Sequence, residues 1–206
     1  MLSNILIAIS ITLMYSTPLA LAAMGGVISE RSGVVNIGIE GMMSIGALAG
    51  AAVGYFSGNP WLGLLFAGIA GGLMSLFHAV ASITFRADQT VSGIALNLIG
   101  PGLALYLSRH FFGGATLTLP VPKKLPKIFD SQHLQGTAFS NFNLDVTVIL
   151  AAIVVTLTWF LLYKTKWGLR IRAMGEHPQA VDTLGFSVYK TRYFCVILSG
   201  ILAGLG

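Results

Sequence analysis

Charge is scarce in this 206-residue sequence. Asp, Glu, Lys and Arg make up 9% of it, whereas soluble domains carry roughly 25%. Together with 55% hydrophobic residues and a mean hydropathy of +0.81, this shortage excludes an ordinary soluble domain and indicates a membrane protein. The net charge of +5 could suggest nucleic acid, but the basic residues flank apolar segments, where cations anchor a chain at the membrane surface. We therefore expect membrane lipid, and no nucleic acid, among its partners.

Several chemical signatures are missing as well. The single cysteine, Cys195, excludes an internal disulfide. The sequence has no HExxH motif, no Cys/His cluster and no paired carboxylates within its apolar segments, which argues against an intramembrane enzyme. It also has no GxxxxGK[ST] phosphate loop, so energy must come from a partner or a gradient. We expect a non-catalytic chain that binds no metal or cofactor of its own.

Long apolar segments are abundant instead. Residues 1–29 contain no charge, so the basic start of a signal peptide is absent and a retained membrane helix over residues 5–29 is expected. Pro18 is tolerable there, because neighbouring helices can satisfy the carbonyl that it frees. Four more spans are predicted at residues 39–56, 61–85, 91–108 and 144–163.

Two features complicate this pattern. Gly100-Pro101-Gly102 predicts a kink or a break in the fourth span. The last apolar segment, residues 193–206, is too short to cross a bilayer, so we expect a fragment that is truncated at its carboxyl end. The sequence thus predicts an all-α, polytopic transmembrane helical bundle with about five complete spans plus a truncated sixth. We treat residues 1–206 as a single domain.

Glycines recur at every fourth position in the second and third spans, at Gly46, Gly50 and Gly54 and again at Gly68 and Gly72. Such rows let helix backbones approach closely inside a bilayer. Internal packing is the favoured interpretation, and a seam between two subunits is the alternative.

Residues 164–192 form the one strongly charged island of the chain, with eight of its 19 charged residues. Lys and Arg number eight on the island's side of the membrane and four on the other, which favours an island in the cytoplasm and an amino terminus outside. If residues 30–40 were re-entrant, the position of the amino terminus would change.

Within the island, Pro178 and Gly185 are placed to start and stop a helix of about two turns. Ala180, Val181 and Leu184 are expected to share one face of it. So short a helix is unstable alone in water, so it must rest on the membrane domain. It is either a connector or a docking surface for a soluble partner.

Three blocks carry a resemblance to a known family. GLRIRAMGEHPQAVDTLGFS, at residues 168–187, resembles the cytoplasmic loop of the ABC-importer permeases that serve branched-chain amino acids, simple sugars and nucleosides. GGVISERSGVVNIGIEGMMSIGA, at residues 25–47, is similar to the signature of the nucleoside and simple-sugar branch. DQTVSGIALNLIG, at residues 88–100, resembles a third family block. Together they cover most of residues 18–206 in the family's order.

The resemblance implies a multi-pass permease subunit in the bacterial plasma membrane, serving nucleosides or, next, simple sugars. It implies ABC ATPase subunits that use the ATP, a second permease subunit and an extracytoplasmic substrate-binding protein. Residues 164–192 would be the cytoplasmic coupling loop. The residues that would couple to the ATPase are Gly175, Glu176, Pro178, Ala180, Asp182 and Gly185. The exact substrate, and whether the permease is a homodimer or a heterodimer, stay open. The alternative is a secondary transporter or channel for a small polar solute, which would not need this loop.

Polar residues inside apolar segments are candidates for the translocation pathway, because they are costly unless paired or facing water. They are Asn36, Glu40 and Asn97. Glu40 has structural alternatives, namely an interaction with Arg31 or a helix cap. His78 is expected to be a packed polar residue.

Overall fold

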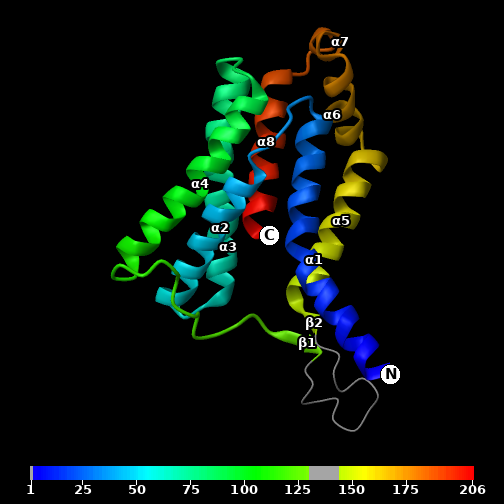
Figure 1. The fold of residues 1–206 in the computed structure, drawn as a ribbon. Coiled ribbons are helices and arrows are strands. Elements are labelled where there is room, and N and C mark those ends of the chain that lie inside the picture. Colours follow the sequence, from blue (N-terminus) through cyan, green and yellow to red (C-terminus); the bar gives the residue numbers. More distant parts are fainter. Residues whose placement is uncertain (1, 130–143) are drawn as a thin grey trace.

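The fold is a bundle of long helices with two short helices at one end (Figure 1). A computed structural model describes residues 2–129 and 144–206. The helices are α1 (Leu2–Arg31), α2 (Ile39–Ser57), α3 (Pro60–Ala79), the π-helical turn η1 (Val80–Thr84), α4 (Gln89–Phe111), α5 (Val146–Lys164), α6 (Lys166–Glu176), α7 (Pro178–Thr183) and α8 (Val188–Leu205). Strands β1 (Lys127–Phe129) and β2 (Leu144–Asp145) pair antiparallel, a small ladder that the sequence did not predict.

Six helices are long and apolar enough to cross a membrane: α1, α2, α3 with η1, α4, α5 and α8. This confirms the all-α polytopic bundle. Two details differ from expectation. Helix α4 continues through Pro101 without a break. Helix α8 starts at Val188, five residues earlier than predicted, so it has 18 residues and qualifies as a span. The expectation of a short sixth segment was wrong because Lys190 and Arg192 belong to this helix and not to a loop.

Local chemistry explains several helix boundaries. Helix α2 ends at Gly58, whose φ of 65° lies in the left-handed region. Pro60 then opens α3, and the Asn59 side chain accepts a hydrogen bond from the Trp61 backbone N–H at 3.0 Å. Asp88 caps α4 in the same way, accepting from the Val91 N–H at 3.0 Å. Asp88 is therefore a solvent-exposed cap.

Helix α8 is the centre of the bundle, since it packs against α1, α2 and α3. Helix α4 packs on α2, and α5 packs on α1 (Figure 1). Cys195 and Val196 of α8 are fully buried, whereas Leu157 and Phe160 of α5 are more than half exposed, as expected for side chains that face lipid.

The glycine rows pack inside this bundle. A Cβ built on Gly46 would lie 2.5 Å from the Cα of Gly204 in α8, and one built on Gly72 would lie 2.8 Å from the Ile201 side chain. Contacts this close leave no room for a methyl group. They confirm internal packing as the role of these rows.

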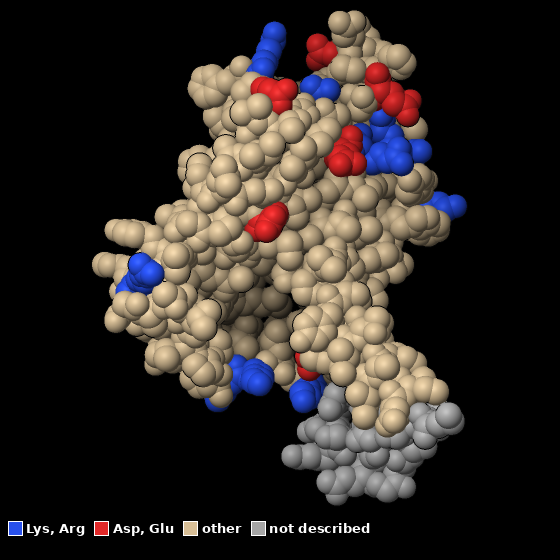
Figure 2. All heavy atoms as spheres, in the orientation of Figure 1, with Lys and Arg blue, Asp and Glu red and all other residues tan. Residues whose placement is uncertain are grey.

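The basic residues divide between the two ends of the bundle, as expected (Figure 2). Arg31 lies against Gly175 of α6, and Arg86 lines a hollow together with Asp182 and Arg192. The island, Arg31 and Arg86 therefore share one end, which we call the α7 end. The amino terminus lies at the opposite end (Figure 1), so its predicted side relative to the island is confirmed.

Candidate functional site

Residues 32–38 form a non-helical connection between α1 and α2, which we call the strap. Its residues alternate between buried and exposed from Val34 to Gly38, which is the pattern of an extended chain. It enters the bundle deeply. Asn36 contacts Ser199, the twelfth residue of α8, which places it about 16 Å along that helix at 1.5 Å per residue.

Side chains of the surrounding helices satisfy the polar backbone of the strap. The Ser29 hydroxyl donates to the Val34 carbonyl at 2.7 Å. The Gln89 carbonyl oxygen accepts from the Val35 N–H at 2.7 Å, and His78 Nε2 lies 3.0 Å from the Val35 carbonyl oxygen. Irregular backbone at membrane depth requires such partners. His78 is fully buried and its Nδ1 meets Ser92 Oγ at 3.0 Å, so its packed, structural role is confirmed.

Asn97 of α4 holds the inner end of the strap, which is the end next to α2. Its amide group donates to the Ile37 carbonyl at 2.9 Å, and its carbonyl oxygen accepts from the Gly41 N–H at 2.8 Å. Asn36 is 4% exposed and donates to Ser199 Oγ at 2.9 Å. Its Oδ1 has no hydrogen-bond partner among the described residues. The structure thus brings both predicted asparagines to the strap, where their hydrogen bonds hold it in place.

Glu40 differs from the two asparagines because its side chain is exposed. It lies in the first turn of α2, where the helix N-terminus stabilises a carboxylate. Val35 and Ile37 of the strap are also exposed, at 42% and 40%. Val35, Ile37 and Glu40 are therefore the outward-facing residues of this region.

The charged island is mostly helical, and α6 was missed by the sequence interpretation. Thr165 caps it by accepting from the Gly168 N–H at 3.1 Å. Ile171 and Met174 are its buried apolar residues. A threonine followed by apolar residues at this spacing is the signal that could have predicted α6.

Helix α7 follows immediately and is the predicted short helix. Pro178 occupies its first position, and Gly185 follows its end with a φ of 82°. The predicted shared face was wrong: Val181 is buried, whereas Ala180 and Leu184 are exposed. Val181 therefore anchors the helix, Pro178 is half-buried, and the other residues of α7 are exposed.

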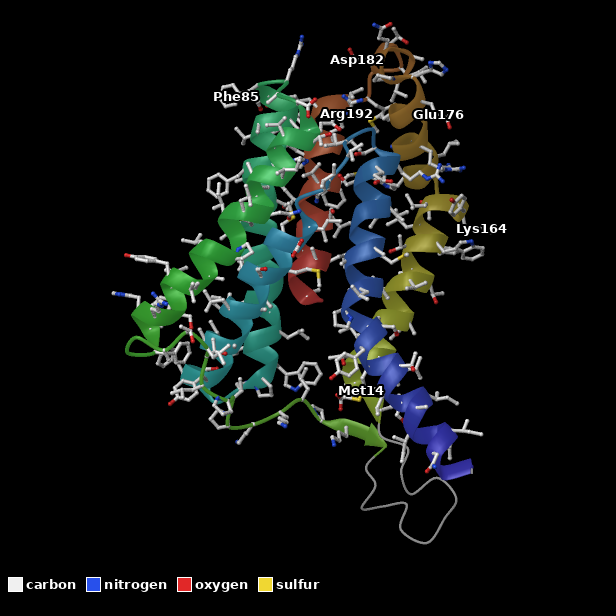
Figure 3. The ribbon with its side chains drawn as sticks, viewed as in Figure 1. Met14, Phe85, Lys164, Glu176, Asp182 and Arg192 are labelled. Carbon is white, nitrogen blue, oxygen red and sulfur yellow. The ribbon has the colours of Figure 1, made fainter. Side chains whose placement is uncertain are left out.

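The six residues predicted to couple to an ATPase lie together around α6 and α7. All are exposed except Pro178, which is half-buried. Figure 3 shows Glu176 and Asp182 at the same extremity of the molecule.

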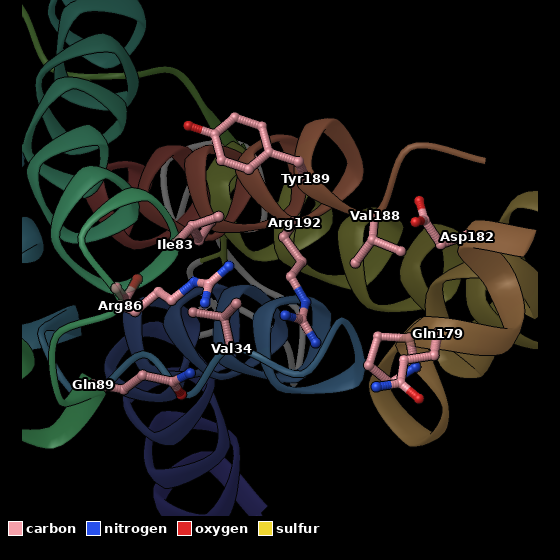
Figure 4. A pocket seen from close by; sticks show the side chains of 11 residues that line it. Val34, Ile83, Arg86, Gln89, Gln179, Asp182, Val188, Tyr189 and Arg192 are labelled. Atoms are coloured by element: carbon pink, nitrogen blue, oxygen red, sulfur yellow. The ribbon is translucent and has the colours of Figure 1, made fainter. Parts of the chain in front are cut away.

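A hollow of about 480 Å³ separates α7 from the strap and the start of α8. Arg86 and Arg192 reach into it from opposite sides above Val34 of the strap (Figure 4). Arg86 has a φ of 53°, which is rare for a residue other than glycine. Arg192 Nε also donates to the Ser32 carbonyl at 3.1 Å. The sequence interpretation counted Arg192 only as a loop cation.

No group of three or more His, Cys, Asp or Glu gathers to hold a metal ion within residues 2–129 and 144–206.

Comparison with known proteins identifies the family to which this chain belongs. Residues 8–206 match the family described as branched-chain amino acid transport system / permease component. The chain is 48% identical to the guanosine ABC transporter permease protein NupQ of Bacillus subtilis, over 97% of the chain and 65% of that protein. It is 42% identical to the nucleoside ABC transporter permease protein NupC of Lactococcus lactis, over 94% of the chain and 63% of that protein. It is 39% identical to the putative glucose ABC transporter permease protein TsgC13 of Haloferax volcanii, over 94% of the chain and 59% of that protein.

No solved structure matches the chain. The chain spans less than two thirds of the length of these three relatives. The family match nevertheless covers nearly all of its residues, and with them the strap and both short helices. The chain therefore belongs to the family of branched-chain amino acid transport system permease components.

Proposed function

We propose that this chain is a permease subunit of an ATP-driven ABC importer in a bacterial plasma membrane, and that the importer carries nucleosides. Simple sugars are the second choice. The names of the relatives support this order, because the guanosine and nucleoside permeases are 48% and 42% identical to the chain and the glucose permease is 39% identical. A multi-pass helical bundle fits the same role.

The complete transporter then includes two ABC ATPase subunits, a second permease subunit and an extracytoplasmic substrate-binding protein. The ATPase subunits bind and hydrolyse the ATP. This chain is non-catalytic and supplies half of the pathway.

The observation that carries the coupling role is the exposure of α7. It is a six-residue helix, too short to be stable alone, and Val181 anchors it to the bundle. The six proposed coupling residues lie in α7 or next to it, and all but the half-buried Pro178 are exposed: Gly175, Glu176, Pro178, Ala180, Asp182 and Gly185. A short helix seated on the membrane domain and open on its other side is suited to receive the ATPase.

For the pathway, we propose that Glu40 is the residue that faces the solute. A carboxylate in a membrane span is costly against lipid and is better placed beside water or a polar ligand. Val35 and Ile37 continue the same exposed row. Asn36 and Asn97 contribute indirectly, because they fix the strap that presents this row.

A secondary transporter or channel remains the alternative function, and α7 would then be only a connector. The two functions differ in their energy source. Uptake that stops when ATP is depleted supports the importer, and uptake that persists contradicts it.

The decisive experiment alters α7 in the complete transporter and follows both ATPase co-purification and nucleoside uptake. Gly185→Pro cannot keep the φ of 82°, because proline fixes φ near about −65°. Glu176→Arg reverses an exposed charge beside α7. We expect both variants to insert into the membrane but to lose the ATPase and uptake.

Glu30→Arg is the matched control, since Glu30 is also an exposed carboxylate near the α7 end but lies on α1. Normal co-purification and uptake in both α7 variants would contradict the coupling role. A panel of nucleosides and sugars in the same uptake assay identifies the substrate class.

A further inference from the structure

The outer end of the strap contacts α6 directly. A Cβ built on Gly175 would lie 2.6 Å from the Arg31 carbonyl oxygen and 3.4 Å from the Gly33 backbone nitrogen. Only a residue without a side chain fits between these backbones. Gly175 therefore holds the end of α6 against the point where α1 ends and the strap begins.

Arg192 holds the same point from α8. Its Nε donates to the Ser32 carbonyl at 3.1 Å. Its Nη2 lies so close to Gly33 that a Cβ there would be 2.9 Å away. Gly33 has a φ of 85°, a conformation that favours glycine. The first residues of the strap are thus enclosed between α6 and the Arg192 side chain.

The inner end of the strap lies at the proposed pathway. Asn97, which holds Ile37, is the ninth residue of α4, about 12 Å along that helix. The six residues from Gly33 to Gly38 are joined by five Cα–Cα steps, which span at most about 17 Å when fully extended. The strap is extended and hydrogen bonds hold it at both ends, at Ser32 and at Ile37, so a displacement at Gly33 is passed on to Ile37 and Glu40.

We propose that the strap transmits movement of α6 and α7 to the pathway, with Gly175 and Arg192 as its two points of attachment. This inference rests on the proposed function, in which an ATPase moves α7. Other routes exist in the structure, since α6 also packs on α5 and α7 also packs on α8. The strap differs from these routes because it ends at the exposed row of Val35, Ile37 and Glu40.

The test measures movement of the strap itself in the complete transporter. Ile37→Cys is made in a background in which Cys195 and every other cysteine of the complete transporter are replaced by serine, so that one thiol lies at an exposed strap position. Its reaction rate with a water-soluble maleimide is measured without nucleotide and with ATP and vanadate. We expect the rate to differ between the two states when the attachments are intact.

Gly175→Ala and Arg192→Met then remove the two attachments independently, so that one variant suffices if the other fails to fold. Arg192→Met should retain the ATPase subunit and its ATP hydrolysis, because Arg192 is not among the residues proposed to contact the ATPase. Gly175 is among them, so for Gly175→Ala the labelling is compared only in transporter that co-purifies with the ATPase. Each should lose the nucleotide-dependent change in labelling, and substrate transported per ATP should fall roughly tenfold, within the range of ordinary allosteric coupling. Arg192→Lys keeps the charge but not the Nε hydrogen bond, and should behave like Arg192→Met. Gly102→Ala is the control, because a Cβ there meets nothing within 4 Å.

Three results separate the possibilities. Labelling that still responds to nucleotide in both variants would overturn the strap as the route. A strap thiol that never responds, in a transporter with normal ATP-dependent uptake, would also overturn it and leave the proposed function intact. Uptake by the wild type that continues without ATP would overturn the proposed function and this inference together.

Discussion

Replacing Asn97 with alanine removes both hydrogen bonds that close the inner end of the strap. The Ile37 carbonyl and the Gly41 N–H lose the partners that they now have at 2.9 and 2.8 Å. Alanine offers neither a donor nor an acceptor in their place. Helix α4 itself should be unaffected, because alanine is a strong helix former.

The expected cost follows from the number of bonds and their environment. Side-chain hydrogen bonds between membrane helices contribute about 0.6 kcal/mol on average and about 1.7 kcal/mol at most. Two such bonds predict a loss of about 1–3 kcal/mol in the free energy of unfolding. The loss rises to about 2–6 kcal/mol if both backbone groups stay unsatisfied, since each then costs about 1–3 kcal/mol.

The assay is unfolding in mixed micelles of increasing SDS content, followed by far-UV circular dichroism. Leu98→Ala is the matched control, because Leu98 is the next residue of α4 and is 75% exposed; its change should stay within about 0.5 kcal/mol. A thiol at Ile37 should also react faster with maleimide in the Asn97→Ala background. If Asn97→Ala and Leu98→Ala unfold at the same SDS fraction and label at the same rate, Asn97 does not hold the strap.

Three further predictions concern the bundle. Gly71→Ala should unfold more easily than Gly102→Ala by about 1–3 kcal/mol in the same SDS titration. Both gain the same helix propensity, but only the first puts a Cβ 2.7 Å from the Cα of Gly204; equal stabilities would refute the close packing of α3 on α8. Asp88→Ala should cost about 0.5–2 kcal/mol in the same assay by removing the cap of α4, and no loss would show that the cap is dispensable. Cys195, which is fully buried, should react with maleimide in mass spectrometry only after unfolding, and rapid labelling of the native protein would contradict the packing around α8.

The sequence predicted the membrane helices well because the signal was strong and local. Uncharged segments of about 20 residues and the turn at residues 57–60 placed α2, and α3 together with η1, to within one residue at each end, and placed α1 to within three. The start of α8 was missed because Lys190 and Arg192 look like loop residues in a hydropathy profile. In the structure they occupy the first turns of the helix, with Lys190 exposed and Arg192 hydrogen-bonded to the Ser32 carbonyl.

The site was harder to predict because its geometry depends on contacts far apart in the sequence. Asn36 and Asn97 were recognised as unusual polar residues. That both act on one short backbone segment depends on the pairing of α2 with α4 and α8. The role of Arg192 was equally hidden, since its partner Ser32 lies 160 residues earlier.

If α1 and α2 were regular helices joined by a short turn at the membrane surface, none of these polar contacts would be needed. The break instead requires His78, Gln89 and Asn97 to satisfy backbone groups that a helix would satisfy itself. Three buried or half-buried polar side chains are a costly way to connect two spans. Discontinuous membrane helices of other transporters mark the place where the solute binds. A break that joins the α7 end to the exposed row at Glu40 is therefore best explained by a requirement for movement or binding there. The same reasoning gives residues 32–38 a functional role that the sequence alone does not reveal, and it links them to the charged island through Gly175 and Arg192.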